Sequence, residues 1–188
     1  MNIDALYNLT HGVYVLGADD GGRPVGSAVD AVMQVASKPV VLALPCHNGS
    51  YTDHRDLHRV DRRQRQMCIR DRSCIEKSGR FGLSVLGRGV DPFVIANFGF
   101  RTSRTADKWA EVPHFVEDGL PYLQNCIAVM TCRVLEKQVF ESNTLFTAEV
   151  TDCRNVGKDE PLTYYDYRAS FKNEVLKFLP NILNKKEK

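Results

Sequence analysis

The sequence lacks any long hydrophobic run. Its longest apolar stretches, 40–44 and 126–130, have only the length of a strand, whereas a membrane-spanning helix needs about 20 consecutive apolar residues. Residues 1–4 also lack the basic and hydrophobic regions with which a secretory signal begins. We therefore expect a cytoplasmic protein that does not interact with a membrane.

Several standard motifs of ligand-binding sites are also missing. No G-x-G-x-x-G sequence opens a helix, and the glycines at 82 and 87 lack the Lys-Ser/Thr end of a P-loop. The six cysteines include no C-x-x-C pair, and the five histidines form no H-E-x-x-H arrangement. We therefore expect no metal site, and we expect cysteines that are reduced and mostly buried.

The composition is that of an ordinary globular protein. The chain has 188 residues, of which 43% are apolar and 26% are charged, so it can form one packed domain but not two of ordinary size. We place this domain at residues 1–170 and treat residues 171–188 as a C-terminal extension.

One segment carries the basic character of the chain. Residues 53–72 contain seven arginines and four aspartates, whereas the whole chain has a net charge of only +2. Clustered arginines can neutralise the phosphates of a nucleic acid, but this segment has no interleaved aromatic residues, so we expect no nucleic-acid partner. Residues 60–72 (VDRRQRQMCIRDR) look like translated sequencing-adapter DNA, and we interpret 53–72 as an artefactual insert.

The order of predicted elements favours a mainly β fold. Strands alternate with turns and only short helices, which is typical of an antiparallel barrel rather than of a parallel sheet with crossover helices. Two predicted helices cover 4–9 and 92–98. A third is predicted to begin at 50–52 and to end at 74–79, with the insert between its two halves. The predicted strands cover 13–16, 24–32, 40–44, 81–86 and the long β-rich runs 122–136 and 145–153, with a hairpin turn at 18–23.

Three stretches could together bind a phosphorylated aromatic ligand. Residues 26–39 place small side chains along a strand, which would let a flat ring approach the backbone, or would simply allow close packing. Residues 47–52 carry hydroxyl groups where a helix begins, which suits a phosphate and equally suits an ordinary helix cap. Residues 98–109 place two arginines, a lysine and hydroxyl groups between aromatic residues, which suits phosphate and ring binding or a charged surface loop.

Taken in order, these stretches resemble the flavin reductase-like family, whose nearest forms are archaeal ferric reductase, flavoredoxin and the flavin domain of rubredoxin fusions. The resemblance also rests on 78–86 (SGRFGLSVL), 119–122 (GLPY), 143–146 (NTLF) and 161–165 (PLTYY). It covers nearly the whole chain apart from the basic segment and the C-terminal residues. It implies a homodimer of split antiparallel β-barrels, with flavin mononucleotide (FMN) bound near the subunit interface.

The resemblance also implies a function and a set of cofactor-binding residues. It implies an oxidoreductase that accepts hydride from NAD(P)H and passes electrons to flavin, ferric iron or a redox partner such as rubredoxin. The alternative is a flavoredoxin-type carrier that transfers electrons without significant NAD(P)H oxidation. By this resemblance, the flavin ring is lined by Val29, Asp30, Ala31, Val32 and Met33. Its ribityl and phosphate groups are held by Asn48, Ser50 and Thr52. The site is closed by Phe100, Arg101, Ser103 and Lys108.

Overall fold

The computed structural model describes residues 2–48, 70–103 and 106–184. Within these ranges, seven antiparallel strands form one sheet in the order β2-β1-β5-β8-β9-β4-β3, and two further strands pair as β6-β7. The strands of the large sheet are β1 (Tyr14–Asp19), β2 (Pro24–Val29), β3 (Met33–Ser37), β4 (Val40–His47), β5 (Arg80–Val85), β8 (Ala128–Val139) and β9 (Asn143–Asn155). The smaller pair consists of β6 (His114–Glu117) and β7 (Leu120–Leu123).

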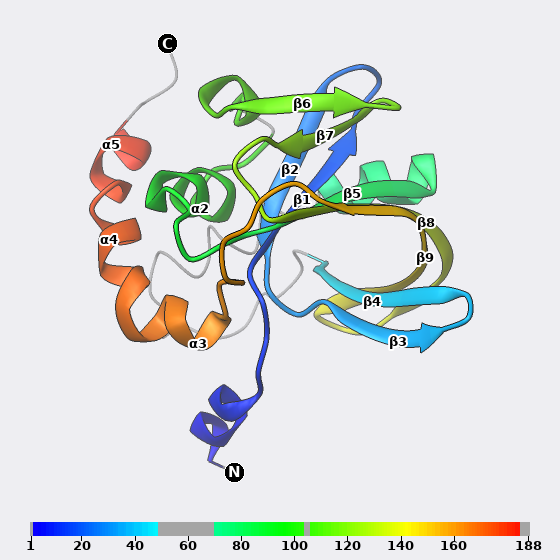
Figure 1. Ribbon diagram of the computed structural model, residues 1–188, viewed down its shortest axis with the longest axis horizontal. Coiled ribbons are helices and arrows are strands. Elements are labelled where there is room, and N and C mark those ends of the chain that lie inside the picture. The colour runs from blue at the N-terminus through cyan, green and yellow to red at the C-terminus, as the bar shows by residue number, and fades with distance from the viewer. Residues whose placement is uncertain (1, 49–69, 104–105, 185–188) are drawn as a thin grey trace.

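The large sheet is curled, and its two edge strands follow one another in the chain. β2 and β3 lie at opposite edges of the sheet but are separated in sequence only by residues 30–32. Figure 1 shows the long β8–β9 hairpin bending so that β4 and β3 face back toward the rest of the sheet. This confirms the predicted mainly β fold, a split antiparallel barrel with short helices.

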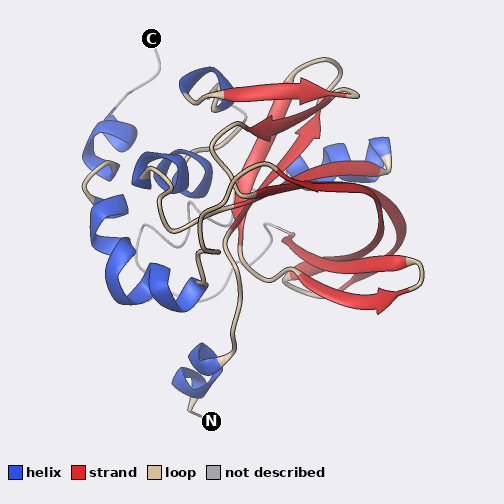
Figure 2. Cartoon of the chain, viewed as in Figure 1, coloured by secondary structure: helices blue, strands red, loops and turns tan. Residues whose placement is uncertain are grey.

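Most of the helices gather on one side of the barrel (Figure 2). The helical elements are η1 (Ile3–Asn8), a segment at 70–78, α2 (Pro92–Phe100), η2 (Trp109–Glu111), α3 (Tyr164–Asp166), η3 (Tyr167–Phe171), α4 (Lys172–Leu176) and α5 (Leu179–Asn184). None of the helices in the described ranges combines the length and the apolar character needed to cross a membrane.

Two hydrophobic clusters form the core. One lies inside the barrel, where Leu16, Phe81 and Phe146 from three strands meet Cys74 and Ile75 of the segment 70–78. The other lies between the barrel and the helices, and it includes side chains from α2, η2, β7 and the C-terminal helices. Segment 70–78 therefore contributes directly to the barrel core.

Local sequence signals were correct where a turn or cap controls the backbone. Gly21 and Gly22 adopt positive φ angles of 65° and 92° in the predicted hairpin turn, a conformation that glycine adopts at no steric cost. Gly79 also has a positive φ, 67°, and its N–H bonds to the carbonyl of Ile75, which ends the helical segment as expected. Asp91 caps α2 by accepting a hydrogen bond from the N–H of Phe93 at 2.8 Å.

Some predicted boundaries differ from the structure. The strand predicted over 24–32 ends at Val29, because the chain must leave one edge of the sheet and cross to the other. The β-rich run 122–136 is broken between β7 and β8, since β7 pairs with β6 outside the large sheet. The long run predicted over 145–153 extends at both ends as β9.

The residues that the sequence analysis assigned to a C-terminal extension pack against the domain. Val175 of α4 is fully buried and Leu179 of α5 is nearly so. The rings of Phe93 in α2 and Phe178 lie edge to face with their centroids 5.6 Å apart. Residues 171–182 thus share the second core cluster with α2.

Candidate functional site

A hydroxyl and an ammonium group from the chain between α2 and η2 meet the backbone of β2. Ser103 Oγ lies 3.2 Å from the carbonyl oxygen of Gly26, and Lys108 Nζ donates to the same oxygen at 2.6 Å. Lys108 Nζ also lies 3.5 Å from the carbonyl oxygen of Phe98. Ser103 and Lys108 are 2% and 1% exposed, so both side chains point into the protein and connect two of the three predicted stretches.

The side chain of Asp71 lies at the same place. It is fully buried, and its Oδ1 accepts a hydrogen bond from Ser103 Oγ at 3.0 Å. Burial raises the pKa of this carboxyl, and the nearby charge of Lys108 and the hydroxyls of Ser103 and Ser27 oppose the shift. Its second oxygen, Oδ2, has no hydrogen-bond partner within the described part of the chain.

Gly26 has no room for a side chain because the carbonyl oxygen of Leu16 and the indole ring of Trp109 lie against it. A Cβ at this position would lie 3.0 Å from Cζ2 of Trp109 and only 2.4 Å from the carbonyl oxygen of Leu16. The Trp109 ring also meets Phe98 edge to face, with centroids 4.7 Å apart. At Gly26, the packing interpretation of the small-residue strand is therefore the one that the structure supports.

Phe100 and Arg101 are positioned at the end of α2. Phe100 is buried in the core between the barrel and the helices. Arg101 donates from one guanidinium nitrogen to Asn97 Oδ1 and to Glu111 Oε1, both at 2.8 Å. The side chain of Arg101 is 14% exposed. It could therefore contact a ligand only from the protein surface beside Asn97 and Glu111.

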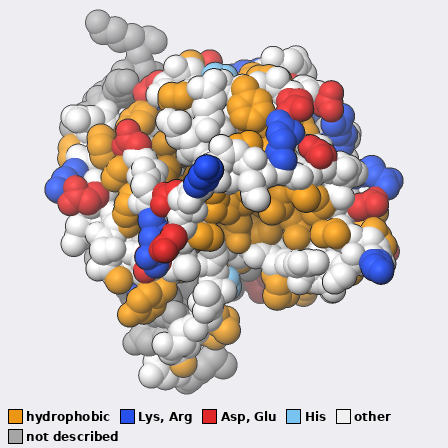
Figure 3. All heavy atoms as spheres, in the orientation of Figure 1, with side chains coloured by type: hydrophobic (Ala, Val, Ile, Leu, Met, Phe, Trp, Pro, Cys, Tyr) orange, Lys and Arg blue, Asp and Glu red, His pale blue; other side chains and the backbone are white. Residues whose placement is uncertain are grey.

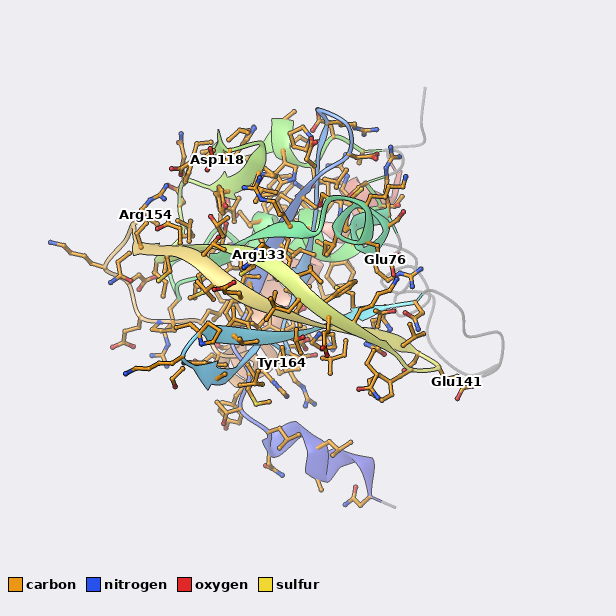
Figure 4. The ribbon with its side chains drawn as sticks, turned by 90° about the vertical axis from the view of Figure 1, so that its right-hand side faces the viewer. Glu76, Asp118, Arg133, Glu141, Arg154 and Tyr164 are labelled. Atoms are coloured by element: carbon orange, nitrogen blue, oxygen red, sulfur yellow. The ribbon has the colours of Figure 1, made fainter. Side chains whose placement is uncertain are left out.

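Asn48 belongs to a hydrogen-bonded group where β4 ends. Its Oδ1 accepts from the hydroxyl of Thr144 at 2.6 Å and from Arg72 at 3.3 Å, and its Nδ2 donates to the carbonyl of Phe140 at 2.6 Å. Arg72 also lies 3.9 Å from Glu76. Figure 4 shows Glu76 on the segment 70–78, beside the strands of the long β8–β9 hairpin, with Glu141 near the turn of that hairpin. The hydrogen bond from Arg72 thus joins Asn48 to the helical segment 70–78.

The other predicted site residues are less closely grouped. Val29 ends β2 and Val32 follows it, and both pack against the barrel core. Asp30 and Ala31 are half-buried between the two edge strands, and the side chain of Met33 is 63% exposed. Ser50 and Thr52 lie outside the described residues.

No role was expected from the sequence for Asp71, Arg72 or Thr144. Asp71 and Arg72 were assigned to the insert, although both are helical and make contacts in the structure. Thr144 was quoted only as part of a family motif. The available signal was a hydroxyl-bearing residue at the start of β9, but its partner Asn48 is 96 residues away in sequence.

The donor set fits an anionic ligand better than a metal. Two hydroxyls and an ammonium group surround the buried carboxyl of Asp71, and such donors suit a phosphate. Within residues 2–48, 70–103 and 106–184, no group of three or more His, Cys, Asp or Glu side chains could hold a metal ion. In this structure Ser103 donates to Asp71, and Lys108 donates to the carbonyl oxygens of Gly26 and Phe98.

Comparison with known proteins agrees with this fold. A family model described as flavin reductase like domain matches residues 6–171. The ferric-chelate reductase (NAD(P)H) of Archaeoglobus fulgidus is 29% identical over 177 residues, which cover 93% of this chain and 94% of that protein. The high molecular weight rubredoxin of Moorella thermoacetica is 27% identical over 190 residues, which cover 100% of this chain and 75% of that protein.

A solved structure shows the same fold. The styrene monooxygenase flavin reductase of Pseudomonas putida S12 matches with a TM-score of 0.65 and 22% identity, covering 86% of this chain and 91% of that chain. The curled sheet with consecutive edge strands thus defines a split β-barrel protein. The chain belongs to the flavin reductase-like domain family, and its function is that of a flavin oxidoreductase.

Proposed function

We propose that the protein binds FMN, accepts hydride from NAD(P)H and passes the electrons to free flavin, ferric iron or a redox protein. The observation that carries this proposal is the meeting of Ser103 and Lys108 with Gly26, because it joins two distant stretches into one set of donors. The Archaeoglobus fulgidus relative, which is named for ferric-chelate reduction with NAD(P)H, supports the same assignment.

Each stretch has a separate role in this proposal. Residues 29–33 line the flavin ring, Asn48, Ser50 and Thr52 hold its ribityl and phosphate groups, and Ser103 and Lys108 supply donors at the phosphate end. Glu111 and Asn97 orient Arg101, and Phe100 supports the loop from within the core. Bound FMN would supply the hydride acceptor, while the protein supplies binding, orientation and electrostatics.

A second candidate function is electron transfer without NAD(P)H oxidation. The relative named high molecular weight rubredoxin favours a redox protein as electron donor or acceptor. In this form the protein would exchange electrons through bound FMN with a partner such as rubredoxin. Anaerobic mixing with NADH and NADPH separates the two functions, because only a reductase is bleached rapidly by a nicotinamide donor.

We also propose that the protein acts in the cytoplasm as a homodimer with FMN near the subunit interface. Exposed apolar side chains on the edge strand β3 and at the start of β4 support this: Met33, Val35 and Val40 are 63%, 49% and 40% exposed. Figure 3 shows hydrophobic side chains gathered in a band across the face of the molecule that is turned toward the viewer. Covering such a surface with a second copy would remove apolar area from water.

The absorption spectrum of the protein tests the proposal. The full chain and a variant lacking residues 53–72 are each mixed with FMN, separated from free ligand, and scanned before and after anaerobic addition of NADH or NADPH. We expect a flavin spectrum that bleaches on reduction and a dimeric mass by light scattering. Protein that stays colourless in both forms, with no saturable FMN binding, contradicts the proposal.

A further inference from the structure

The first helical element stands apart from the rest of the described chain. The chain that follows η1 is tied to the body of the protein at Gly12, which pairs with Thr163, just before β1 begins. Figures 1 and 2 show η1 projecting from the body at the end of an extended stretch of chain. We call residues 2–10 the arm.

The arm exposes apolar side chains. Leu6 and Leu9 are 56% and 58% exposed, and the N–H of Leu9 donates to the carbonyl of Leu6 at 3.1 Å where η1 ends. η1 is a 3-10 helix of six residues. Such a helix has poor hydrogen-bond geometry and is too short to be stable in water without packing against another surface. The arm therefore needs a partner surface for its leucines.

The β3–β4 hairpin offers a matching apolar surface. Met33, Val35 and Val40 are 63%, 49% and 40% exposed. Edge strands are usually protected from association by charged residues or proline, but β3 has the sequence MQVAS and carries neither. Figures 1 and 4 both show η1 and this hairpin on the lower side of the molecule. A second copy that docks on this side would bring its own arm to the hairpin.

The hairpin alone offers little surface for a stable dimer. A standard interface buries about 800 Å² on each partner, whereas the hairpin contributes the partly exposed side chains of Met33, Val35 and Val40. An arm folded back on its own hairpin would cover these side chains and remove them from the proposed interface. An arm that crosses to the other copy adds its leucines to that interface, and two-fold symmetry uses the contact twice.

We propose that the arm of each copy packs Leu6 and Leu9 against the β3–β4 hairpin of a second copy, so that exchanged arms hold the homodimer together. The inference rests on the proposed homodimer and identifies the segment that forms the contact. It does not depend on which electron donor or acceptor the protein uses.

The dissociation constant of the dimer tests the role of the arm. It is measured by sedimentation over a dilution series for the full chain and for the double variant Leu6→Ser/Leu9→Ser. Burial of a leucine side chain is worth at least about a factor of ten in affinity, and each dimer would bury two arms. We therefore expect the dissociation constant to rise at least about a hundredfold.

Val116→Ser is the control for a general effect of removing an exposed apolar side chain. Val116 is 53% exposed and belongs to β6, which Figure 1 shows at the upper side of the molecule, away from η1 and the hairpin. We expect this variant to dimerise like the wild type. All three substituted side chains are already exposed in the protomer, so melting temperatures should change little.

A mixture of two cysteine variants tests whether the arm crosses between copies. Leu6→Cys labelled with ¹⁵N is mixed with unlabelled Val35→Cys, both with Cys153→Ser to remove an exposed native thiol. After oxidation with diamide, peptides are analysed by mass spectrometry. We expect a disulfide that joins a labelled peptide containing position 6 to an unlabelled peptide containing position 35, because each chain carries only one of the two substitutions.

The outcomes separate this inference from the proposed function. An unchanged dissociation constant for Leu6→Ser/Leu9→Ser overturns the inference, and so does a link between positions 6 and 35 that forms only when both substitutions are in one chain. A wild type that stays monomeric overturns the inference together with the proposed homodimer. The FMN spectrum is recorded on the same samples. A dimer that depends on the arm but binds no FMN supports the inference and contradicts the proposed function.

Discussion

Lys108 and Gly26 are joined by a hydrogen bond of 2.6 Å from the ammonium group to the carbonyl oxygen, although 82 residues separate them in sequence. Lys108 follows α2 and Gly26 lies in the middle of β2. This contact, together with that of Ser103, holds the chain after α2 against the strand. The stability of the site therefore depends on a buried ammonium group.

Replacing Lys108 by methionine should destabilise the protein. The side chain would still fill its space, but the carbonyl oxygens of Gly26 and Phe98 would lose a charged donor. Hydrogen bonds to charged groups contribute about 1.5–3 kcal/mol, so we expect a loss of that order in the free energy of unfolding, measured by chemical denaturation. The control is Lys137→Met, whose side chain is 51% exposed and paired with Glu76, and which should cost less than about 1 kcal/mol. Equal effects of the two substitutions would contradict a stabilising role for the hydrogen bonds of Lys108 to Gly26 and Phe98.

Gly26 and Gly99 should respond in opposite ways to replacement by alanine. At Gly26 the new Cβ would lie 2.4 Å from the carbonyl oxygen of Leu16 and 3.0 Å from the Trp109 ring, and such overpacking costs about 1–3 kcal/mol. At Gly99 in α2 it would meet only the Cβ of Ala28, at 3.8 Å, and alanine is favoured over glycine in helices by about 1 kcal/mol. Melting temperatures should fall for Gly26→Ala and stay equal or rise for Gly99→Ala. A Gly26→Ala protein that melts like the wild type would show that both the Leu16 backbone and the indole can shift to make room.

The cysteines should differ sharply in reactivity in the folded protein. Burial raises the pKa of the Cys74 and Cys132 thiols to about 12 and that of Cys126 to about 11, so almost none of these groups is thiolate at pH 8. Cys153 is exposed and should react with iodoacetamide before these three. Mass spectrometry of peptides after brief native labelling measures this order, with urea-unfolded protein as the control. Early labelling of Cys74 would mean that the helical segment opens readily.

The ionisation of Asp71 should make stability depend on pH. Its pKa is raised in the folded state from the ordinary value of 3.8, so the folded protein binds this proton more tightly than the unfolded chain does. The contribution to stability is fully present below pH 3.8 and is lost as pH rises through the raised folded pKa. Lys108 and Arg70, which face the carboxyl, limit the shift but do not reverse its direction.

The substitution Asp71→Asn removes this dependence, since the amide does not titrate. Denaturation at several pH values above 4 should show the wild type losing stability relative to the variant as pH increases. Comparing the two proteins cancels the other titrating groups to a first approximation. Parallel curves for the two proteins would show that the carboxyl keeps an ordinary pKa.

The sequence by itself predicted the features that depend on neighbouring residues. The glycines at 21 and 22 predicted the β1–β2 hairpin turn, Gly79 predicted the end of the helical segment, and the apolar run at 40–44 predicted β4. Turn, cap and strand preferences act over a few residues, so local sequence is sufficient for them. The family resemblance extended these local predictions to a split barrel.

Only the tertiary structure decided which side chains form the site. The small residue at Gly26 could have faced a ligand, but Trp109 covers it, and Lys108 could have faced solvent, but its ammonium group points inward to a carbonyl. Asp71 belonged to a segment with no expected place in the fold, yet its carboxyl is buried against Ser103. The direction of each side chain is set by partners that are distant in sequence and become neighbours only when the sheet curls and the core packs, which local preferences cannot specify.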